Sequence, residues 1–273
     1  MDKQSFIDVS SLEAKELHPY RTLRRPMEHR DKGIFVAEGE KVVCRLLESS
    51  IEVISILATP EWIEKLGAGG HPTSRAGAIY RAKKELVETI VGANLHQGIM
   101  AIGKIPPELP LETVIRGLPK PFLAVALDGL VHAENVGVVV RNCAGFGVDA
   151  VIVGESSSSP YLRRAVRNSM GTVFKQTVIH TEDLAASLSL LHAKYETTVI
   201  AADPRGEIVP DERDFSRNVC LVFGSEGEGL SDRVLSLCQK RFAIPMSNNV
   251  DSLNVASASA VVLYETQKQR GKI

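Results

Sequence analysis

The sequence lacks the long apolar runs, paired cysteines and basic leader that are typical of membrane and secreted proteins. No uninterrupted apolar run is long enough to span a bilayer. The first ten residues, MDKQSFIDVS, have no basic start followed by an apolar core, so we expect no secretory signal. The cysteines are scattered without a C-x-x-C pair, which favours reduced thiols over zinc or disulfides: Cys44, Cys143, Cys220 and Cys238. We therefore expect a cytoplasmic protein without a membrane segment or a metal.

Several common enzyme fingerprints are also absent. No G-x-G-x-x-G follows a predicted strand, and the chain contains neither a P-loop nor a G-x-S-x-G motif. His132-Ala-Glu134 matches half of the zinc deaminase signature, but the P-C-x-x-C half is missing, so we treat this match as coincidence. Cys143 lies on an apolar helix face and is expected in the core rather than as a nucleophile.

The chain has little excess charge of either sign. The formal net charge is −1, with 44% hydrophobic and 24% charged residues, which indicates a globular protein with a sizeable core. A local basic patch remains compatible with this balance. One basic segment, with Tyr20 and His29 interleaved, has residues suited to RNA phosphates and unpaired bases: Arg21, Arg24, Arg25, Arg30 and Lys32. The alternative is a solvated charged segment, since Glu28 and Asp31 dilute its charge.

Prolines divide the chain into two parts. Four of them, Pro106, Pro107, Pro110 and Pro119, crowd residues 106–120, and such density suits a semi-rigid linker. Before the linker, residues 1–105 contain predicted strands at 33–36, 51–57, 79–81 and 99–105 and helices at 38–49 and 83–91. This pattern predicts a small α/β domain in front of a second domain over residues 121–273.

The second part alternates strands and helices throughout. Residues 122–127 form a nearly continuous apolar run, as expected for a strand buried on both faces of a parallel sheet. Further strands are predicted at 150–153, 173–179, 197–201, 219–223 and 241–244, with helices at 135–146, 161–168, 182–195, 231–237 and 253–270. The pattern predicts an α/β fold with a largely parallel sheet.

Three loops that follow predicted strands are chemically unusual, and ligands of open parallel sheets bind beyond the carboxyl ends of strands. The first loop leads to Asn135 and Arg141, the second places Glu226 among three glycines, and the third contains Ser252 and Asn254. Each loop alone has an ordinary explanation: helix caps at Asn135, Ser252 or Asn254, a solvated Arg141, and a flexible turn.

Together the loops resemble the three motifs of the SpoU (TrmH) RNA 2′-O-ribose methyltransferases, in order and spacing. The matching words are N-x-G-x-x-x-R, F-G-x-E-x-x-G-L-S and I-P-M followed by S-L-N-V, and Arg167-Asn-Ser-Met-Gly171 is similar to the family's R-x-S-x-G segment. The resemblance covers residues 122–269. The sequence departs from many relatives at His132-Ala-Glu134, where they carry Asp-Pro. The front domain resembles, more loosely, the ribosomal-protein-like RNA-binding domain of many relatives.

The resemblance implies a deep trefoil knot in the second domain, a homodimer, and S-adenosylmethionine as the methyl donor. It assigns the polar site to Arg141, Asn135, Glu226, Ser252 and Asn254. It places the cofactor against the backbone of Gly224, Ile244 and Leu253, with Met246 nearby, and adds Arg167 to the residues expected to bind RNA. Arg141 is either the base or a clamp on the phosphate and the hydroxyl; the second role is easier to explain, because arginine keeps its proton up to a pH of about 12.

The resemblance thus predicts methyl transfer to a ribose 2′-hydroxyl in structured RNA. The front domain favours ribosomal RNA by analogy, and transfer RNA is the alternative. A second alternative is a catalytically idle RNA-binding assembly factor on the same fold, against which the retained polar residues argue. Base methylation is a third, and the S-L-N-V segment argues against it.

Overall fold

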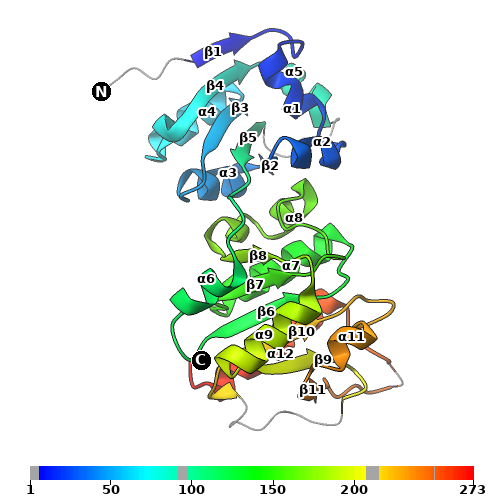
Figure 1. Ribbon diagram of the computed structural model, residues 1–273. Helices are drawn as coiled ribbons and strands as arrows, with labels where there is room; N and C mark the ends of the chain where they lie inside the picture. The colour runs from blue at the N-terminus through cyan, green and yellow to red at the C-terminus, as the bar shows by residue number, and fades with distance from the viewer. Residues whose placement is uncertain (1–5, 92–97, 207–214, 249) are drawn as a thin grey trace. The chain divides into compact units, whose positions relative to one another are not determined.

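The chain forms two compact units in the computed structural model, which describes residues 6–91, 98–206, 215–248 and 250–273. Unit 1 comprises Met1–Pro107 and Tyr161–Phe174, and unit 2 comprises Glu108–Pro160 and Lys175–Ile273 (Figure 1). Residues 161–174 therefore belong by their contacts to unit 1, although they lie inside the stretch expected to form the second domain.

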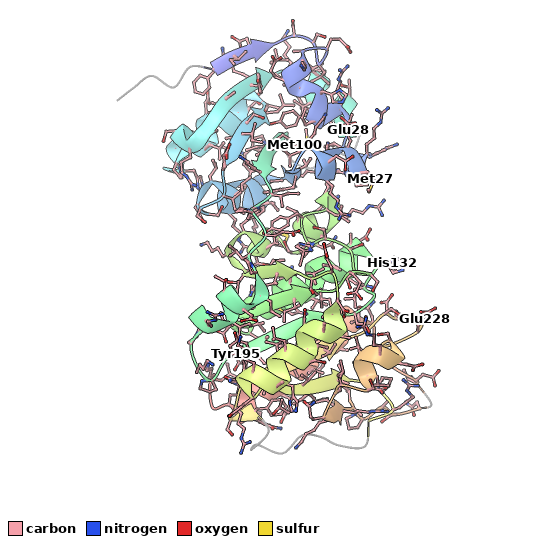
Figure 2. All side chains as sticks on the ribbon, in the orientation of Figure 1. Met27, Glu28, Met100, His132, Tyr195 and Glu228 are labelled. Carbon is pink, nitrogen blue, oxygen red and sulfur yellow. The ribbon has the colours of Figure 1, made fainter. Side chains whose placement is uncertain are left out.

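Unit 1 is built on a mixed five-stranded sheet in the order β1-β4-β3-β5-β2. Its strands are β1 (Phe6–Val9), β2 (Ile34–Glu38), β3 (Val53–Ala58), β4 (Ala76–Ala82) and β5 (Ile99–Lys104). Strands β1, β4 and β3 run parallel, whereas β5 is antiparallel to both β3 and β2. The helices are α1 (His18–Arg21), α2 (Pro26–Asp31), α3 (Glu40–Leu47), α4 (Pro60–Ala68) and α5 (Lys84–Val91). Buried Leu17, Tyr20, Leu57, Val87 and Met100 belong to its core, and Figure 2 labels Met100 there.

The segment 161–174 joins unit 1 through specific contacts. It carries α8 (Arg163–Asn168) and a 3₁₀ helix, Thr172–Lys175, whose last residue belongs to unit 2. The Arg163 guanidinium donates to the Glu38 carboxylate at 2.6 Å, and the rings of Phe35 and Phe174 stack with centroids 5.3 Å apart. The predicted start of the strand at 173–179 is therefore wrong. Phe174 is buried on Phe35 after the turn at Gly171, and the strand begins only at Val178.

Unit 2 contains a six-stranded sheet in the order β11-β9-β10-β6-β7-β8, and every pairing in it is parallel. The strands are β6 (Leu123–Leu127), β7 (Ala150–Val153), β8 (Val178–His180), β9 (Thr198–Ala202), β10 (Val219–Phe223) and β11 (Lys240–Phe242). The predicted α/β fold with a parallel sheet is confirmed. All five residues of β6 are at most 1% exposed, as expected for a strand buried on both faces.

Helices cover both faces of this sheet: α6 (Leu111–Gly117), α7 (Ala133–Gly145), α9 (Leu184–Tyr195), α11 (Asp232–Leu235) and α12 (Val255–Gln269). Side chains from α6, α9 and α11 pack with alternate residues of the central strands, such as Ala124, Ala126 and Val222. In Figure 1, α9 lies in front of the strands and α12 behind them. Helix α12 packs on α7, where the Asn142 side chain donates to Ala256 O at 2.8 Å and Ser259 Oγ at 2.9 Å.

Candidate functional site

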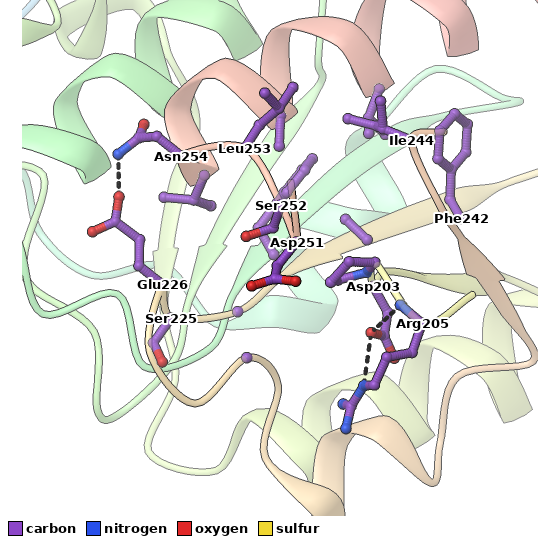
Figure 3. Close-up of a pocket in the computed structure, with 18 of the residues that line it drawn as sticks. Asp203, Arg205, Ser225, Glu226, Phe242, Ile244, Asp251, Ser252, Leu253 and Asn254 are labelled. Carbon is purple, nitrogen blue, oxygen red and sulfur yellow. Dashed lines mark hydrogen bonds and ion pairs between the residues drawn. The ribbon is translucent and has the colours of Figure 1, made fainter. Parts of the chain in front are cut away.

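A cavity of about 580 Å³ lies beyond the carboxyl ends of β9, β10 and β11. Because these strands are parallel, the loops that follow them meet at one edge of the sheet. The segment before α12 closes the cavity on a further side, with Ser252 and Leu253 in its wall (Figure 3). The second and third loops singled out in the sequence thus line one cavity.

The glycine-rich loop after β10 folds back on itself within a few residues. Ser225 N donates to Gly229 O at 2.9 Å, and Gly229 N donates to Ser225 O at 3.0 Å. A Cβ atom on Gly224 would lie 2.3 Å from the Gly229 carbonyl carbon, which no side chain could tolerate. Gly229 has φ +75°, a conformation that favours glycine. The loop is therefore a tight backbone turn rather than a flexible connection.

Asp128, at the end of β6, connects the first loop to the glycine-rich loop. Its carboxylate oxygen Oδ2 accepts from Ser231 N at 2.8 Å and from Ser231 Oγ at 2.9 Å. The Asp128 side chain is buried, so these bonds are shielded from water. Ser231 also caps α11, because its side chain accepts from Val234 N.

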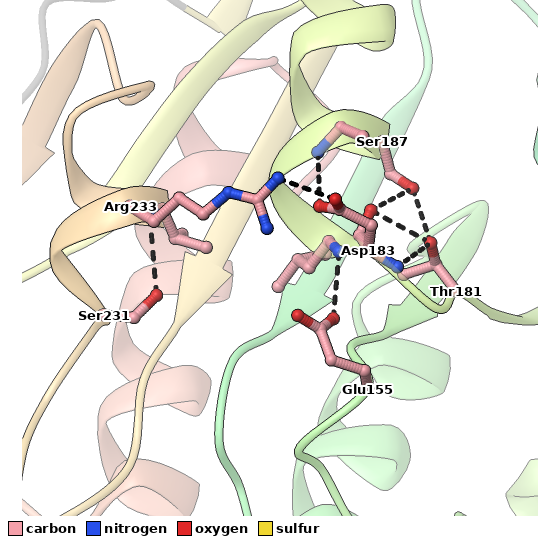
Figure 4. Close-up of polar contacts among 9 residues, drawn as sticks. Glu155, Thr181, Asp183, Ser187, Ser231 and Arg233 are labelled. Atoms are coloured by element: carbon pink, nitrogen blue, oxygen red, sulfur yellow. Dashed lines mark hydrogen bonds and ion pairs between the residues drawn. The ribbon is translucent and has the colours of Figure 1, made fainter.

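Beyond Ser231, α11 is joined to α9 (Figure 4). Arg233 donates to the Asp183 carboxylate at 2.6 Å, and Asp183 caps α9 by accepting from Ala186 N at 2.8 Å. The Glu155 carboxylate accepts from Leu184 N at 2.9 Å at the same helix end. Arg233 and the α9 backbone amide lower the pKa of Asp183, with the backbone hydrogen bond as the larger cause. The far end of the glycine-rich loop is thus fixed to two helices.

Three polar side chains from three different elements meet at one end of the cavity. The Asn254 amide nitrogen donates to the Glu226 carboxylate and lies 3.4 Å from Asn135 Oδ1. Asn254 also caps α12, because its Oδ1 accepts from Ala256 N at 2.9 Å. Asn135, however, lies inside α7, which His132 precedes as the N-cap. Asn135 and Asn254, which were predicted to belong to one polar site, are 119 positions apart in the sequence and adjacent in the structure.

The cavity itself combines an apolar wall with acidic groups. Phe223, Phe242, Ile244, Leu253 and Val255 supply apolar surface, and Gly224 and Met246 lie in the same wall. Its ionisable lining residues are mostly acidic, with one guanidinium among them: Asp203, Glu226, Glu228, Asp251 and Arg205. Buried Asp203 fixes Arg205, since its Oδ1 accepts from Arg205 N at 3.0 Å and from Arg205 Nε at 3.2 Å. All of the residues predicted to contact the cofactor line this cavity.

Sequence reasoning missed Asp203, Arg205 and Asp251 as cavity residues. Asp203-Pro-Arg-Gly follows β9, so the strand-end argument used for the other loops could have identified it. Asp251 directly precedes Ser252 in a segment that was already singled out. Single polar residues after a strand are common in turns, so the signal was weak.

Arg141 takes no part in the hydrogen bonds of the polar cluster. It is exposed on α7, six residues after Asn135, and is not among the described residues that line the cavity. No hydrogen bond or ion pair of its side chain is found within the described part of the chain.

The residues expected to bind RNA lie in unit 1. Arg167 is exposed on α8, while Arg24 and Arg30 are exposed near α2. Arg21 pairs with Glu13 at 2.8 Å, and Lys32 pairs with Glu28 at 2.7 Å. Arg25 is 3.9 Å from the Glu28 carboxylate, which also contacts His18; Figure 2 labels Glu28. The basic segment is therefore divided between paired and unpaired cations.

The four cysteines show no sign of a reactive or metal-binding group. All four are free thiols, and burial raises the pKa of Cys44 to about 11 and that of Cys238 to about 12. Cys143 and Cys220 are fully buried, and their pKa values are raised further by the same cause. Across the residues that the structure describes, no three His, Cys, Asp or Glu side chains are grouped as a metal would require.

Comparison with known proteins identifies the class. Residues 122–264 match the model of the SpoU rRNA Methylase family. The chain belongs to this family of RNA methyltransferases, which use S-adenosylmethionine, so the predicted family, enzyme class and cofactor are confirmed at this level. Within the described residues, no helix has the length and apolar character to cross a membrane.

Particular relatives extend the match beyond the catalytic part. An uncharacterized tRNA/rRNA methyltransferase of Mycobacterium bovis is 31% identical over 270 residues, covering 94% of this chain and 90% of the relative. The 23S rRNA (guanosine-2′-O-)-methyltransferase RlmB of Acinetobacter baylyi is 31% identical over 197 residues, covering 71% of this chain and 79% of that protein.

Solved structures share the fold along nearly the whole chain. The SpoU methyltransferase AviRb of Streptomyces viridochromogenes aligns with a TM-score of 0.79 at 22% identity, over 94% of this chain and 98% of that one. An AdoMet-bound rRNA methyltransferase of Sinorhizobium meliloti aligns with a TM-score of 0.79 at 23% identity, over 96% of this chain and 98% of that one.

Proposed function

We propose that this protein transfers a methyl group from S-adenosylmethionine to a ribose 2′-hydroxyl in structured RNA, with ribosomal RNA as the first candidate. The observation that carries the proposal is the meeting of Asn135, Glu226 and Asn254 at one end of a cavity beyond a parallel sheet. Similarity to a protein named as a 23S rRNA guanosine-2′-O-methyltransferase supports the reaction and the RNA class.

The cavity suits the cofactor in size, surface and charge. Its volume of about 580 Å³ falls within the range of small-molecule sites. Ile244 and Leu253 offer an apolar wall to adenine, and Gly224 lines the same cavity without a side chain, so that its backbone groups can face a ligand. The acidic lining complements a cofactor whose sulfonium and ammonium groups outweigh its carboxylate. Bound there, the cofactor would supply an electrophilic methyl group.

The polar cluster would receive the ribose. The Asn254 amide holds Glu226 and Asn135 side by side, so that the Glu226 carboxylate can accept from a hydroxyl and the Asn135 amide can donate to one. Ser252 lies in the wall of the larger cavity. Holding the 2′-hydroxyl in line with the methyl group supplies much of the rate enhancement in such reactions. We assign Arg141 the role of a clamp that grips the neighbouring phosphate and polarises the hydroxyl.

We further propose that Arg141 acts in the site of a partner subunit of a homodimer. It is exposed and is not part of its own cavity's described lining. Exposed Val261 and Tyr264 on α12 offer apolar surface for the contact, with Val261 42% and Tyr264 53% exposed. Family membership also leads us to propose the trefoil knot in unit 2.

Unit 1 is proposed to bind the RNA around the target nucleotide. The exposed cations Arg24, Arg30 and Arg167 are available for phosphates, whereas Arg21 and Lys32 already pair with carboxylates. Transfer RNA is the second candidate, because the name of the mycobacterial relative gives both RNA classes.

One experiment tests the reaction and the RNA class together. The purified protein is incubated with tritiated S-adenosylmethionine and unmodified transcripts of 16S rRNA, 23S rRNA and a tRNA pool. The labelled RNA is then digested to nucleosides and analysed by mass spectrometry. We expect a 2′-O-methylated nucleoside from ribosomal RNA. Label on a base, or RNA binding without any transfer, would contradict the proposal and support base methylation or an idle assembly factor respectively.

A further inference from the structure

A second, smaller cavity of about 330 Å³ adjoins the one described above. The two cavities share the wall formed by Ser225–Glu228 and by Val255. The smaller cavity is completed by the segment Gly129–His132, which follows β6, and by Asn135. The polar cluster of Asn135, Glu226 and Asn254 therefore stands at the boundary between the two cavities.

The segment Gly129–His132 is held rigidly by the loop after β7. Leu130 N donates to Ser157 Oγ at 3.1 Å, and Ser158 N donates to Leu130 O at 2.8 Å. The Ser158 hydroxyl donates to Val131 O at 2.6 Å. Gly129 makes the turn out of the strand with φ +68°. These bonds fix the backbone on both sides of Val131, so the side chains that follow are presented from a defined position.

His132 is presented by this segment without any partner of its own. It precedes α7 as the N-cap residue, yet its side chain makes no capping hydrogen bond. The imidazole is exposed, and no hydrogen bond or ion pair of the ring is found among the described residues. Val131 beside it is 62% exposed. Figure 2 labels His132 and Glu228 at the same edge of unit 2.

The walls of the smaller cavity favour an uncharged aromatic group over an anion. Its ionisable lining residues are His132, Glu226 and Glu228, and neither Lys nor Arg is among the described residues that line it. Two carboxylates would repel a phosphate. An imidazole with a neighbouring isopropyl group, in contrast, can stack on an unpaired base, which is how proteins commonly recognise splayed-out nucleotides.

We propose that the smaller cavity binds the nucleobase of the acceptor nucleotide in RNA, and that His132 stacks on that base. This inference rests on the proposed function. If the methyl donor occupies the larger cavity, the acceptor ribose lies at the polar cluster on the boundary, and its own base reaches the smaller cavity. His132 is then a specificity-determining residue of the acceptor site, distinct from the residues that hold the cofactor.

The test compares His132→Ala and His132→Phe with the wild type on unmodified 23S rRNA transcripts. Initial rates of tritiated methyl transfer give kcat/KM, and calorimetry gives the Kd of S-adenosylmethionine on the same preparations. We expect His132→Ala to lower kcat/KM roughly tenfold, the size of one base–aromatic stacking contact, with the cofactor Kd unchanged. His132→Phe keeps a stacking ring and should retain kcat/KM to within about threefold.

The matched control is His192→Ala. His192 is an exposed histidine on α9, outside the lining of either cavity, and its Nδ1 lies 3.1 Å from Thr197 O. Equal kcat/KM for His132→Ala and wild type would overturn the acceptor cavity while leaving the proposed function intact. A His132→Phe rate as low as that of His132→Ala, or a parallel loss of cofactor affinity, would also overturn it. Absence of transfer by the wild type would reject the proposed function itself, and this inference with it.

Discussion

At Gly224, the addition of a single methyl group should lower the affinity for the cofactor. A Cβ atom there would meet the Gly229 backbone at 2.3 Å, so the turn would have to open. Gly224→Ala should weaken S-adenosylmethionine binding at least tenfold, because the backbone groups facing the cavity would move. Calorimetric titration of the cofactor measures this.

The neighbouring Gly227 provides the matched control. Nothing lies within 4 Å of a Cβ at that position, and its φ is not in the left-handed region. Gly227→Ala should therefore change cofactor affinity less than about threefold, since the turn keeps its backbone. Equal losses from the two substitutions would mean that alanine disturbs the loop by some route other than the Gly229 contact.

Substitution of Arg141 should affect methyl transfer but not cofactor binding. It is exposed on α7 and is absent from the described lining of the cofactor cavity, so Arg141→Ala should leave the cofactor Kd nearly unchanged. Loss of a charged group that acts mainly in the transition state lowers turnover by about a hundredfold or more. Arg141→Lys should recover little, because a point charge does not reproduce the planar guanidinium. The measurements are tritiated methyl transfer and cofactor calorimetry; normal turnover in Arg141→Ala would remove Arg141 from the mechanism.

The four cysteine thiols, two buried and two half-buried, lead us to expect a dependence of stability on pH. Burial raises the pKa of Cys44 to about 11 and that of Cys238 to about 12, and it raises the pKa values of Cys143 and Cys220 as well. In the unfolded chain thiols ionise near pH 8.5, so between pH 8 and 9.5 only the unfolded state loses these protons. This favours unfolding, and the stability that is present at pH 7.5 should decline progressively over that window.

Thermal unfolding measured at steps from pH 7.5 to 9.5 tests this expectation, because tyrosines ionise mostly above that range. The same burial should make the native thiols react slowly with a disulfide reagent at pH 7.5, whereas all four should react at once in denaturant. A melting temperature that stays constant up to pH 9.5, together with fast native reactivity, would show that the thiols are more accessible than the structure indicates.

At the scale of elements, Asp128 joins the ends of two strands and the start of a helix. Asp128→Ala would leave Ser231 N and Ser231 Oγ without their acceptor, at a cost of about 1–3 kcal/mol in unfolding free energy. It should also weaken cofactor binding, because Ser231 ends the glycine-rich loop. Urea unfolding and calorimetry measure the two effects.

Arg233→Ala is the control for the Asp128 experiment. It breaks the contact between α11 and α9, but the Arg233 side chain is 65% and the Asp183 side chain 40% exposed, and such surface pairs contribute less than about 1 kcal/mol. Cofactor affinity should stay within twofold of wild type. If Arg233→Ala costs as much as Asp128→Ala, the loop is stabilised from the helices and not from Asp128.

The elements of unit 2 were largely predictable because its strands β6, β7 and β10 are buried on both faces. The strand expected at 150–153 is β7, and that expected at 219–223 is β10. The prediction failed at 173–179, where Val173 and Phe174 are apolar because they pack in unit 1 and not because they belong to a strand. In unit 1, β1, α1, α2 and α4 were not predicted. The first three, β1, α1 and α2, have four to six residues each and carry little periodicity. Helix α4 has nine residues with Pro60 at its start, and the sequence reasoning overlooked it.

The polar site was predictable only in part for a related reason. Strand ends identified the loops that hold Glu226 and Asn254, since parallel strands bring their carboxyl ends together. Asp203 was overlooked because a single polar residue after a strand is a weak signal. His132 was overlooked as a site residue because its significance depends on a cavity that forms only when distant loops meet. Asn135 and Arg141 need not share a face of α7, because six residues do not complete two helical turns.

At the scale of the whole molecule, the proposed partner-subunit role of Arg141 can be tested by mixing two inactive variants. Arg141→Ala lacks the clamp and Asn254→Ala lacks part of the polar cluster, so each homodimer should be inactive. A mixed dimer has one cavity with an intact Asn254 that receives Arg141 from the other subunit. If the subunits mix at random, half of the dimers carry one working site of two, giving about a quarter of wild-type activity.

The mixing experiment requires subunit exchange, which co-expression with two affinity tags provides. Tandem purification isolates the mixed dimer, for which the expected activity is about half that of a wild-type dimer with the same tags. Cofactor titration of the same preparation should still detect binding in the cavity with intact Asn254. If Arg141 acted in its own subunit, every site of the mixed dimer would lack one essential group, and the activity would be as low as in the parent variants. Sedimentation of the wild type as a monomer at micromolar concentration would contradict the shared site directly.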